Sequence, residues 1–295
     1  MRTRELGALS EPVLVFGGPV SNLHATQAML EVAKALGIPP ARIICTGDLA
    51  AYCAQPAETI DCVMQSGVEV VMGNCEESLA DNSDDCGCGF DEDSTCDVLA
   101  VDWYRHSNAQ VTAPQRSWMS TLPSRIAFSM NAKRFVVVHG ALSSINRFVF
   151  PATRGKDIDE ELALTDADVV IGGHSGVPFT RARGDRLWHN CGSIGMPAND
   201  GTSRTWYSTI TPTETSVILQ CHPLRYDVGG ARAAMTEAGL GPAYSDTLES
   251  GIWPSNDVMP AGDQARQGVA LDEDNLIHEL PCPLESRSVL MAAPG

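Results

Sequence analysis

The chain has 295 residues, of which 43% are hydrophobic, and a formal net charge of −17 at pH 7. This acidic balance argues against nonspecific binding to nucleic acids or to anionic membrane surfaces, and no apolar run is long enough to span a bilayer. The stretch Met1–Leu9 holds two Arg residues but no apolar core typical of a signal peptide, so we expect a cytoplasmic location. The ten cysteines are then expected to be reduced thiols or metal ligands rather than a disulfide framework.

The first part of the chain alternates apolar runs with helix signals. The predicted elements, in chain order, are a strand at 13–16, a helix at 23–36, a strand at 43–46, a helix at 57–66 and a strand at 68–72. Ser21 or Asn22 can cap the first helix, Gly37 ends it, and Pro56 starts the second. This βαβαβ order predicts a parallel sheet with helices packed over it.

The second part begins with an interruption at residues 76–97, which carry nine acidic residues, no basic residue and three cysteines, and which we interpret as an inserted loop. The elements predicted after it are helices at 97–108 and from Pro114, a hairpin at 125–130 and 134–138, a helix at 157–164, strands at 168–171, 179–183, 186–189, 205–210 and 217–222, and a helix at 225–238. Parallel strands followed by hairpins predict an α/β fold, a four-layer α/β/β/α sandwich of two mixed sheets.

The same patterns divide the chain into three parts. Residues 12–222 are predicted to form the main domain and residues 223–254 to supply covering helices. From about Ser255 the sequence is rich in Pro, Gly and acidic residues without periodicity, so residues 255–295 are predicted to form a poorly ordered tail.

Four apolar runs each end in one polar side chain, and these are the candidate metal ligands: Asp48, Asn74, His139 and His174. The carboxyl ends of strands in an open α/β sheet meet at one edge, so these side chains are expected to converge. A mixed set of oxygen and nitrogen donors suits Mn, Fe or Zn.

The order of these motifs resembles that of the calcineurin-like metallophosphoesterases. Gly47-Asp48, Gly73-Asn74, His139-Gly140 and Gly173-His174 follow one another as in that family. The segments around Tyr52 and Pro56, at 173–179 and at 190–197 are similar to its small bacterial phosphodiesterase branch. The resemblance covers about residues 12–222. It implies a metal-dependent hydrolase whose substrate is a small-molecule phosphomonoester or phosphodiester.

Carried over residue by residue, the resemblance implies that only half of a two-metal site is present. Asp48 matches the bridging ligand, and the other three candidate ligands match those of the second metal. The opening Asp-x-His of the family falls on Gly18-Pro19-Val20, and the last His falls on Gly176, so three ligands of the first metal are absent. Cys75 stands where the family has a histidine that assists at the phosphate.

Three interpretations of this loss remain open. In the first, one metal suffices, and free N–H groups near Gly18, Ser21 and Asn22 hold the phosphate at a helix start. In the second, Cys75 and the pair Cys86 and Cys88 supply replacement ligands, so that one or two ions are bound. In the third, the site is vestigial, and the protein binds a metal or a ligand, or senses redox state, without hydrolysis.

The predicted site therefore has three kinds of residue. The catalytic candidates are Asp48, Asn74 and Cys75. The substrate-binding candidates are Gly18, Ser21, Asn22, Arg147 and His189. Asp48 and Asn74 are also counted among the four metal ligands. The sequence does not indicate an oligomeric state.

Overall fold

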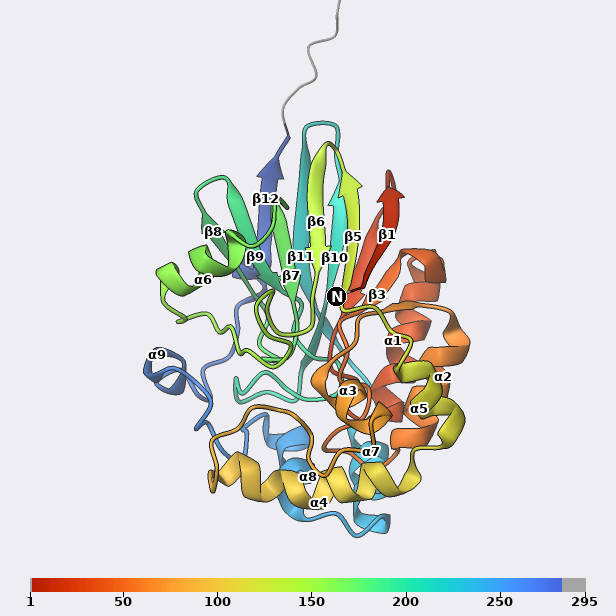
Figure 1. The fold of residues 1–295 in the computed structure, drawn as a ribbon. Helices are drawn as coiled ribbons and strands as arrows, with labels where there is room; N and C mark the ends of the chain where they lie inside the picture. The colour runs from red at the N-terminus through yellow and green to blue at the C-terminus, as the bar shows by residue number, and fades with distance from the viewer. Residues whose placement is uncertain (1, 283–295) are drawn as a thin grey trace, which may run out of the picture.

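Two mixed sheets lie face to face in the computed structural model, which describes residues 2–282 (Figure 1). The first sheet has the strand order β1-β5-β6-β7-β9-β8. Its strands are β1 (Thr3–Ala8), β5 (Arg125–Met130), β6 (Lys133–Val137), β7 (Val169–Gly172), β8 (Phe179–Arg183) and β9 (Arg186–Asn190). The pairs β1·β5, β6·β7 and β7·β9 are parallel, and the other pairs are antiparallel.

The second sheet has the order β12-β11-β10-β2-β3-β4. Its strands are β2 (Val13–Phe16), β3 (Ile43–Cys45), β4 (Glu69–Val70), β10 (Thr205–Pro212), β11 (Ser216–Leu224) and β12 (Ile277–Pro281). Only β2, β3 and β4 pair in parallel among these described strands, as the βαβαβ order predicts.

Helices cover the outer faces and one end of the sandwich (Figure 1). They are α1 (Leu23–Ala35), α2 (Pro56–Ser66), α3 (Asn74–Ala80), α4 (Thr95–Gln110), α5 (Ala113–Met119), α6 (Gly155–Leu162), α7 (Val228–Glu237), α8 (Pro242–Ser250) and α9 (Ala261–Gln264). The Asn22 side chain accepts a hydrogen bond from the Ala25 N–H at 3.0 Å and so caps α1, as predicted.

The core explains the four layers. Along β2, Val13 and Val15 belong to the apolar cluster between the two sheets, whereas Leu14 and Phe16 belong to the cluster under α1 and α2. Successive side chains of a strand point to opposite faces of the sheet, so both faces of β2 are buried, one against the other sheet and one against the helices. On the other sheet, α6 packs its apolar residues against the outer surface of β6, β7 and β9. The predicted α/β/β/α sandwich of two mixed sheets is confirmed.

Three predictions about local structure are wrong. The polar segment Thr3–Ala8 was not predicted to be a strand, yet it pairs with β5, because an edge strand can form through backbone hydrogen bonds while its side chains stay exposed. The insertion at 76–97 is not all loop, because α3 covers its start and α4 begins at Thr95 near its end. In the same segment Cys86 and Cys88 form a disulfide, so they are not the reduced thiols or replacement ligands that the sequence analysis expected.

The third concerns the tail predicted from Ser255. Its described part contains α9 and the strand β12, which pairs with β11 and buries Leu280 between the sheets. Residues 283–295 of that predicted tail lie outside the described residues. Across residues 2–282, no helix has both the length and the apolar character needed to cross a membrane.

Candidate metal centre

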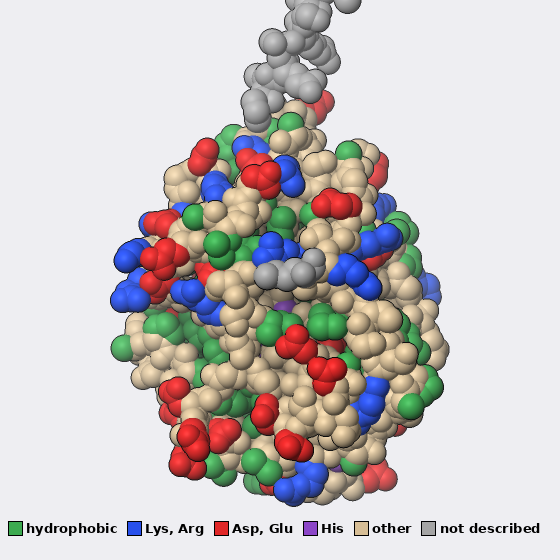
Figure 2. Space-filling view, viewed as in Figure 1, with side chains coloured by type: hydrophobic (Ala, Val, Ile, Leu, Met, Phe, Trp, Pro, Cys, Tyr) green, Lys and Arg blue, Asp and Glu red, His purple; other side chains and the backbone are tan. Residues whose placement is uncertain are grey.

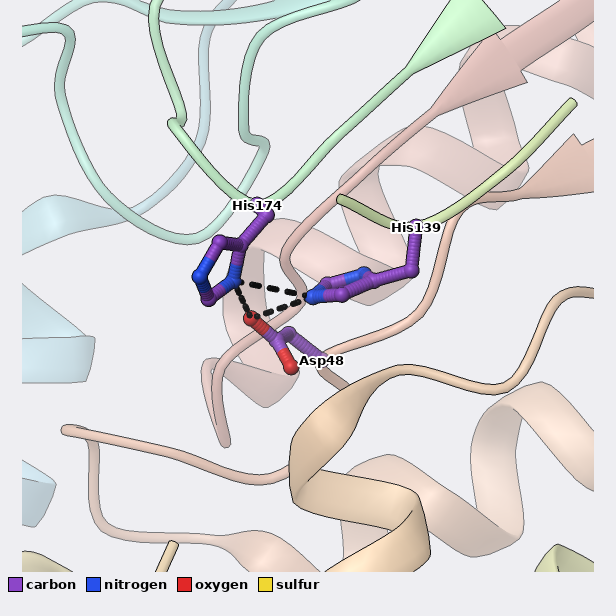
Figure 3. A group of neighbouring side chains, drawn as sticks. All are labelled: Asp48, His139 and His174. Atoms are coloured by element: carbon purple, nitrogen blue, oxygen red, sulfur yellow. Dashed lines mark hydrogen bonds and ion pairs between the residues drawn. The ribbon is translucent and has the colours of Figure 1, made fainter. Parts of the chain in front are cut away.

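The four predicted metal ligands converge at the carboxyl edge of both sheets. Asp48 follows β3 and Asn74 begins α3 after β4, both from the second sheet. His139 follows β6 and His174 follows β7, both from the first sheet. Figure 3 shows the side chains of Asp48, His139 and His174 pointing toward one another. The site therefore depends on the packing of one sheet against the other.

The donor atoms lie within a few ångströms of each other. His139 Nε2 is 2.9 Å from Asn74 Oδ1, 3.0 Å from His174 Nδ1 and 3.3 Å from Asp48 Oδ2. His174 Nδ1 is 3.7 Å from the same Asp48 oxygen. All four residues are buried or nearly so. Two oxygens and two ring nitrogens thus face one small, largely buried space.

Neighbouring groups fix the orientation of two of these ligands. His139 Nδ1 lies 2.6 Å from the carbonyl oxygen of Thr46, which places the ring proton on Nδ1 and leaves the lone pair of Nε2 facing the centre. The Asn74 side-chain nitrogen donates to the carbonyl oxygen of Cys86 at 3.0 Å, so its Oδ1 must face His139. In the neutral His139 ring, the Nε2 lone pair and Asn74 Oδ1 therefore face each other, which favours a cation between them.

This donor set fits a divalent cation. Asp48 Oδ1 and His174 Nε2 are also buried without a hydrogen-bond partner. Burial opposes ionisation of Asp48, but His139 and His174 outweigh it and hold the pKa of this carboxyl below its ordinary value. Burial lowers the pKa of His174, so this ring stays neutral and keeps a lone pair for a metal. Mn, Fe or Zn would satisfy all four donor atoms.

Glu76 is a residue of this site that the sequence analysis did not single out. It is buried, and its carboxylate accepts hydrogen bonds from the backbone N–H groups of Leu49 at 2.7 Å, Asp48 at 2.8 Å and Gly73 at 2.9 Å. It thus ties the loop after β3 to the loop after β4. Burial and the nearby Asp48 raise the pKa of Glu76 to about 7. A glutamate three residues after Gly73, the N-cap of α3, is the signal that could have revealed it, since a Glu at this position accepts a hydrogen bond from the N-cap N–H.

The ligand loops hold unusual backbone conformations that Glu76 and its neighbours support. Asp48 has a φ of 58° and His174 a φ of 57°, in the left-handed region that disfavours residues with a Cβ. A Cβ on Gly73 would lie 2.7 Å from Glu76 Oε2 and 2.8 Å from the Asp48 nitrogen, so only glycine fits there. Such strained conformations concentrate at functional sites.

The predicted phosphate cradle at the start of α1 is not free to bind an anion. The backbone N–H groups of Gly18, Ser21 and Asn22 donate to carbonyl oxygens of Gly47, Leu49 and Pro19, at 3.1, 2.8 and 2.8 Å. The Ser21 hydroxyl accepts from the Ala51 N–H, and the Asn22 side chain caps α1. The expectation of free N–H groups is therefore wrong, because contacts with the loop after β3 use those of Gly18 and Ser21 and a local turn uses that of Asn22.

Two further substrate-binding candidates lie away from the cluster. Arg147 donates to Glu161 at 2.7 Å, and the Glu161 side chain is only 2% exposed. His189 is fully buried, and its two ring nitrogens contact the hydroxyls of Thr180 at 2.8 Å and Ser208 at 2.9 Å. Burial lowers the pKa of His189 to about 3. Both side chains therefore have structural partners that the sequence pattern did not show.

Cys75 lies beside the ligands, as predicted. It is buried next to Asn74, whose side-chain nitrogen is 3.6 Å from its sulfur. Burial, followed by the charge of Asp48, raises the pKa of this thiol well above its usual value. Burial at this position therefore favours the protonated thiol over the thiolate.

Comparison with known proteins agrees with this geometry. A family model for the calcineurin-like phosphoesterase superfamily domain matches residues 18–212. The protein MJ0912 of Methanocaldococcus jannaschii is 24% identical over 204 residues, which cover 63% of this chain and 77% of the relative.

Two solved structures share the fold. A metallophosphoesterase from Sphaerobacter thermophilus has a TM-score of 0.63 and 21% identity, and the match covers 83% of this chain and 100% of that one. The hypothetical protein PH1004 from Pyrococcus horikoshii has a TM-score of 0.68 and 14% identity, and the match covers 82% of this chain and 99% of that one. By its matched domain, its two-sheet fold and its converging ligands, this chain belongs to the calcineurin-like phosphoesterase superfamily.

Proposed function

We propose that this protein is a metal-dependent phosphoesterase that acts on a small-molecule phosphate ester with a single divalent ion. The observation that carries the proposal is the convergence of Asp48, Asn74, His139 and His174, whose potential ligand atoms lie 2.9–3.7 Å from one another. Membership of the phosphoesterase superfamily supports a hydrolase. The reaction adds water to phosphorus, breaks the ester P–O bond and releases an alcohol and a phosphate.

Each residue has a distinct part in this proposal. The bound ion supplies positive charge that stabilises the developing charge on the phosphate oxygens. Thr46 and Glu76 act as positioning residues, because one orients the His139 ring and the other fixes the backbone of Asp48. Cys75 is a further positioning residue, because its buried thiol lies against Asn74 and the Asp48 carboxylate.

Hydrolysis assays with the metal-loaded protein test this function. Generic phosphomonoesters and phosphodiesters are supplied with Mn, Fe or Zn, and the rates are compared with those of Asp48→Ala and His174→Ala. We expect metal-dependent turnover that falls by at least about 100-fold in both variants. His222→Ala serves as the matched control, since His222 contacts Thr209 on β10 and has no contact with the cluster. Turnover that persists in both ligand variants would reject the proposal.

A second candidate function is a redox-sensing metal-binding protein. It is favoured by the contacts of Asn74, whose side-chain nitrogen lies 3.0 Å from the Cys86 carbonyl oxygen and 3.4 Å from Cys88 Sγ. A dithiol reductant would open the Cys86–Cys88 disulfide to two thiols while the reductant is oxidised to its own disulfide. The Asn74 amide would then lose part of its support.

Metal content measured before and after dithiol treatment distinguishes the two functions. A redox sensor loses metal on reduction, and Cys88→Ser lacks metal in both states. An enzyme that does not use the disulfide keeps the same metal content and the same hydrolysis rate in both states and in the variant.

A further inference from the structure

A cavity beside the metal centre occupies the side where three ligands of the resembled family are missing. Its wall includes Gly18, Val20 and Gly176, the positions at which those ligands are absent, together with Asp48 and His174. We propose that this cavity binds the ring of a phosphate ester with one aromatic ring and one phosphate group. This inference rests on the proposed function, because it assigns the phosphate of the same substrate to the metal centre.

A side chain at either of two of those positions would adopt a left-handed backbone conformation and would contact the wall of the cavity. A Cβ on Gly18 would lie 2.6 Å from Ser193 Oγ, at a φ of 50°. A Cβ on Gly176 would meet the Trp253 ring at 3.7 Å, at a φ of 66°. Trp253 thus lies over the position from which a metal ligand would extend. The wall of the cavity on this side is mostly apolar.

Aromatic side chains from distant parts of the chain form the walls. Tyr52 stacks on Tyr244 of α8 with ring centroids 4.5 Å apart. Phe148 stacks on the ligand His174 at 4.0 Å, and the Trp253 indole N–H donates to the Pro197 carbonyl oxygen at 2.7 Å. These contacts hold the rings in place before a ligand arrives. Preorganised aromatic walls favour a flat ring, which stacks on them or meets them edge to face.

The enclosed volume of the cavity suits a single ring. The cavity volume is about 80 Å³. At about 10–15 Å³ for each water-sized group, this space holds roughly six non-hydrogen atoms. A phenyl ring has that number, whereas a nucleoside has about three times as many.

The charge around the cavity limits the ligand to one phosphate. Among the described residues, the cavity wall includes no Lys or Arg, so the metal centre is the only cationic group available to an anion. Acidic side chains gather on the lower part of the face in Figure 2, where Figure 1 shows α4 and the loop before it. That loop carries the exposed residues Asp84, Asp85, Asp91, Glu92 and Asp93. A second phosphate would be repelled without a compensating cation.

Phosphonates that cannot be hydrolysed test the inference without requiring turnover. Benzylphosphonate and ethylphosphonate carry the same charged group and differ in the ring. We expect calorimetric titration of the Mn-loaded protein to show benzylphosphonate binding about tenfold more tightly or better, since the ring becomes buried. Equal affinities, or no binding of either compound, would overturn the inference.

Two cavity variants and one control locate the ring. Val258→Trp adds bulk to the cavity wall, and Trp253→Leu removes an aromatic surface. Each should lower the ratio of benzylphosphonate to ethylphosphonate affinity by about threefold or more. Val98→Trp, at a position on α4 that is 61% exposed, should leave the ratio unchanged. Metal content and near-ultraviolet circular dichroism confirm that each variant is folded. If one of the two cavity variants does not fold, the affinity ratio of the other tests the inference.

The outcomes separate this inference from the proposed function. A ring preference that survives in every folded cavity variant would overturn the inference, because the ring would then bind elsewhere. Metal-dependent hydrolysis with no ring preference would support the function and reject the inference. A ring preference that the cavity variants abolish, in a protein without hydrolysis, would support the cavity and reject the function.

Discussion

Replacing Glu76 tests whether this buried carboxylate builds the metal centre. Its Oε2 accepts from the N–H groups of Asp48 and Gly73, and its Oε1 accepts from that of Leu49. In Glu76→Gln, one amide oxygen can still serve two of the donors, but the amide NH₂ faces the third. One buried N–H without an acceptor lowers the free energy of unfolding by about 1–3 kcal/mol. Glu76→Ala removes all three acceptor contacts, and we expect a loss of about 3–5 kcal/mol.

The assay is urea unfolding of the metal-free protein at pH 6, below the pKa of about 7 that Glu76 has in the folded state, so that Gln replaces a largely protonated carboxyl and the relief of a buried charge does not enter the comparison. Calorimetric titration with Mn follows the second consequence. Because Glu76 holds the Asp48 backbone, we expect the metal affinity of Glu76→Gln to fall by about 10–100-fold.

Glu77→Gln is the matched control, since the adjacent Glu77 is exposed. It should change the free energy of unfolding by less than about 0.5 kcal/mol and leave the metal affinity unchanged. If Glu76→Gln behaved like Glu77→Gln in both measurements, the positioning role of Glu76 would be refuted.

Three further predictions follow from the site and its surroundings. The pKa of His189 is about 3 in the folded protein against about 6.5 when unfolded, so only the unfolded chain takes up a proton between pH 7 and pH 5. Stability therefore falls as the pH falls, by about 2 kcal/mol from this group, and urea titrations of His189→Gln should lack that part of the loss. Arg147→Ala should lower the free energy of unfolding by about 1–3 kcal/mol, because Glu161 loses its cation, while KM for a phosphate ester stays the same; a rise in KM would instead indicate a substrate contact. Mn at about 100 times its dissociation constant should stabilise the protein by about 2.7 kcal/mol, and a thermal melt should show no such gain after chelation or in His174→Ala.

Strong local patterns explain why the sequence predicts most of the fold. Apolar runs such as Val13–Phe16 and Val169–Gly172 have few alternatives to a buried strand, and Gly or Pro marks most of the helix ends. The polar strand Thr3–Ala8 escaped prediction because its stability comes from backbone pairing with β5, which leaves no periodic signal in its side chains.

The candidate ligands were predictable for a related reason. Each follows a buried strand, and the geometry of parallel sheets brings strand ends together whatever the loops contain. The roles of Gly18 and Glu76 were not predictable in this way. The Gly18 N–H is used by the carbonyl oxygen of Gly47, and Glu76 stands in an acidic run where only the fold distinguishes the buried carboxylate from its exposed neighbours.

The number and position of bound metal ions test the account most directly. We predict that protein loaded with Mn and freed of excess ion holds one ion per chain by elemental analysis. An anomalous difference map should place that ion among Asp48 Oδ2, Asn74 Oδ1, His139 Nε2 and His174 Nδ1, and His139→Ala should hold none. Two ions per chain, or one ion bound away from these four atoms, would contradict the account.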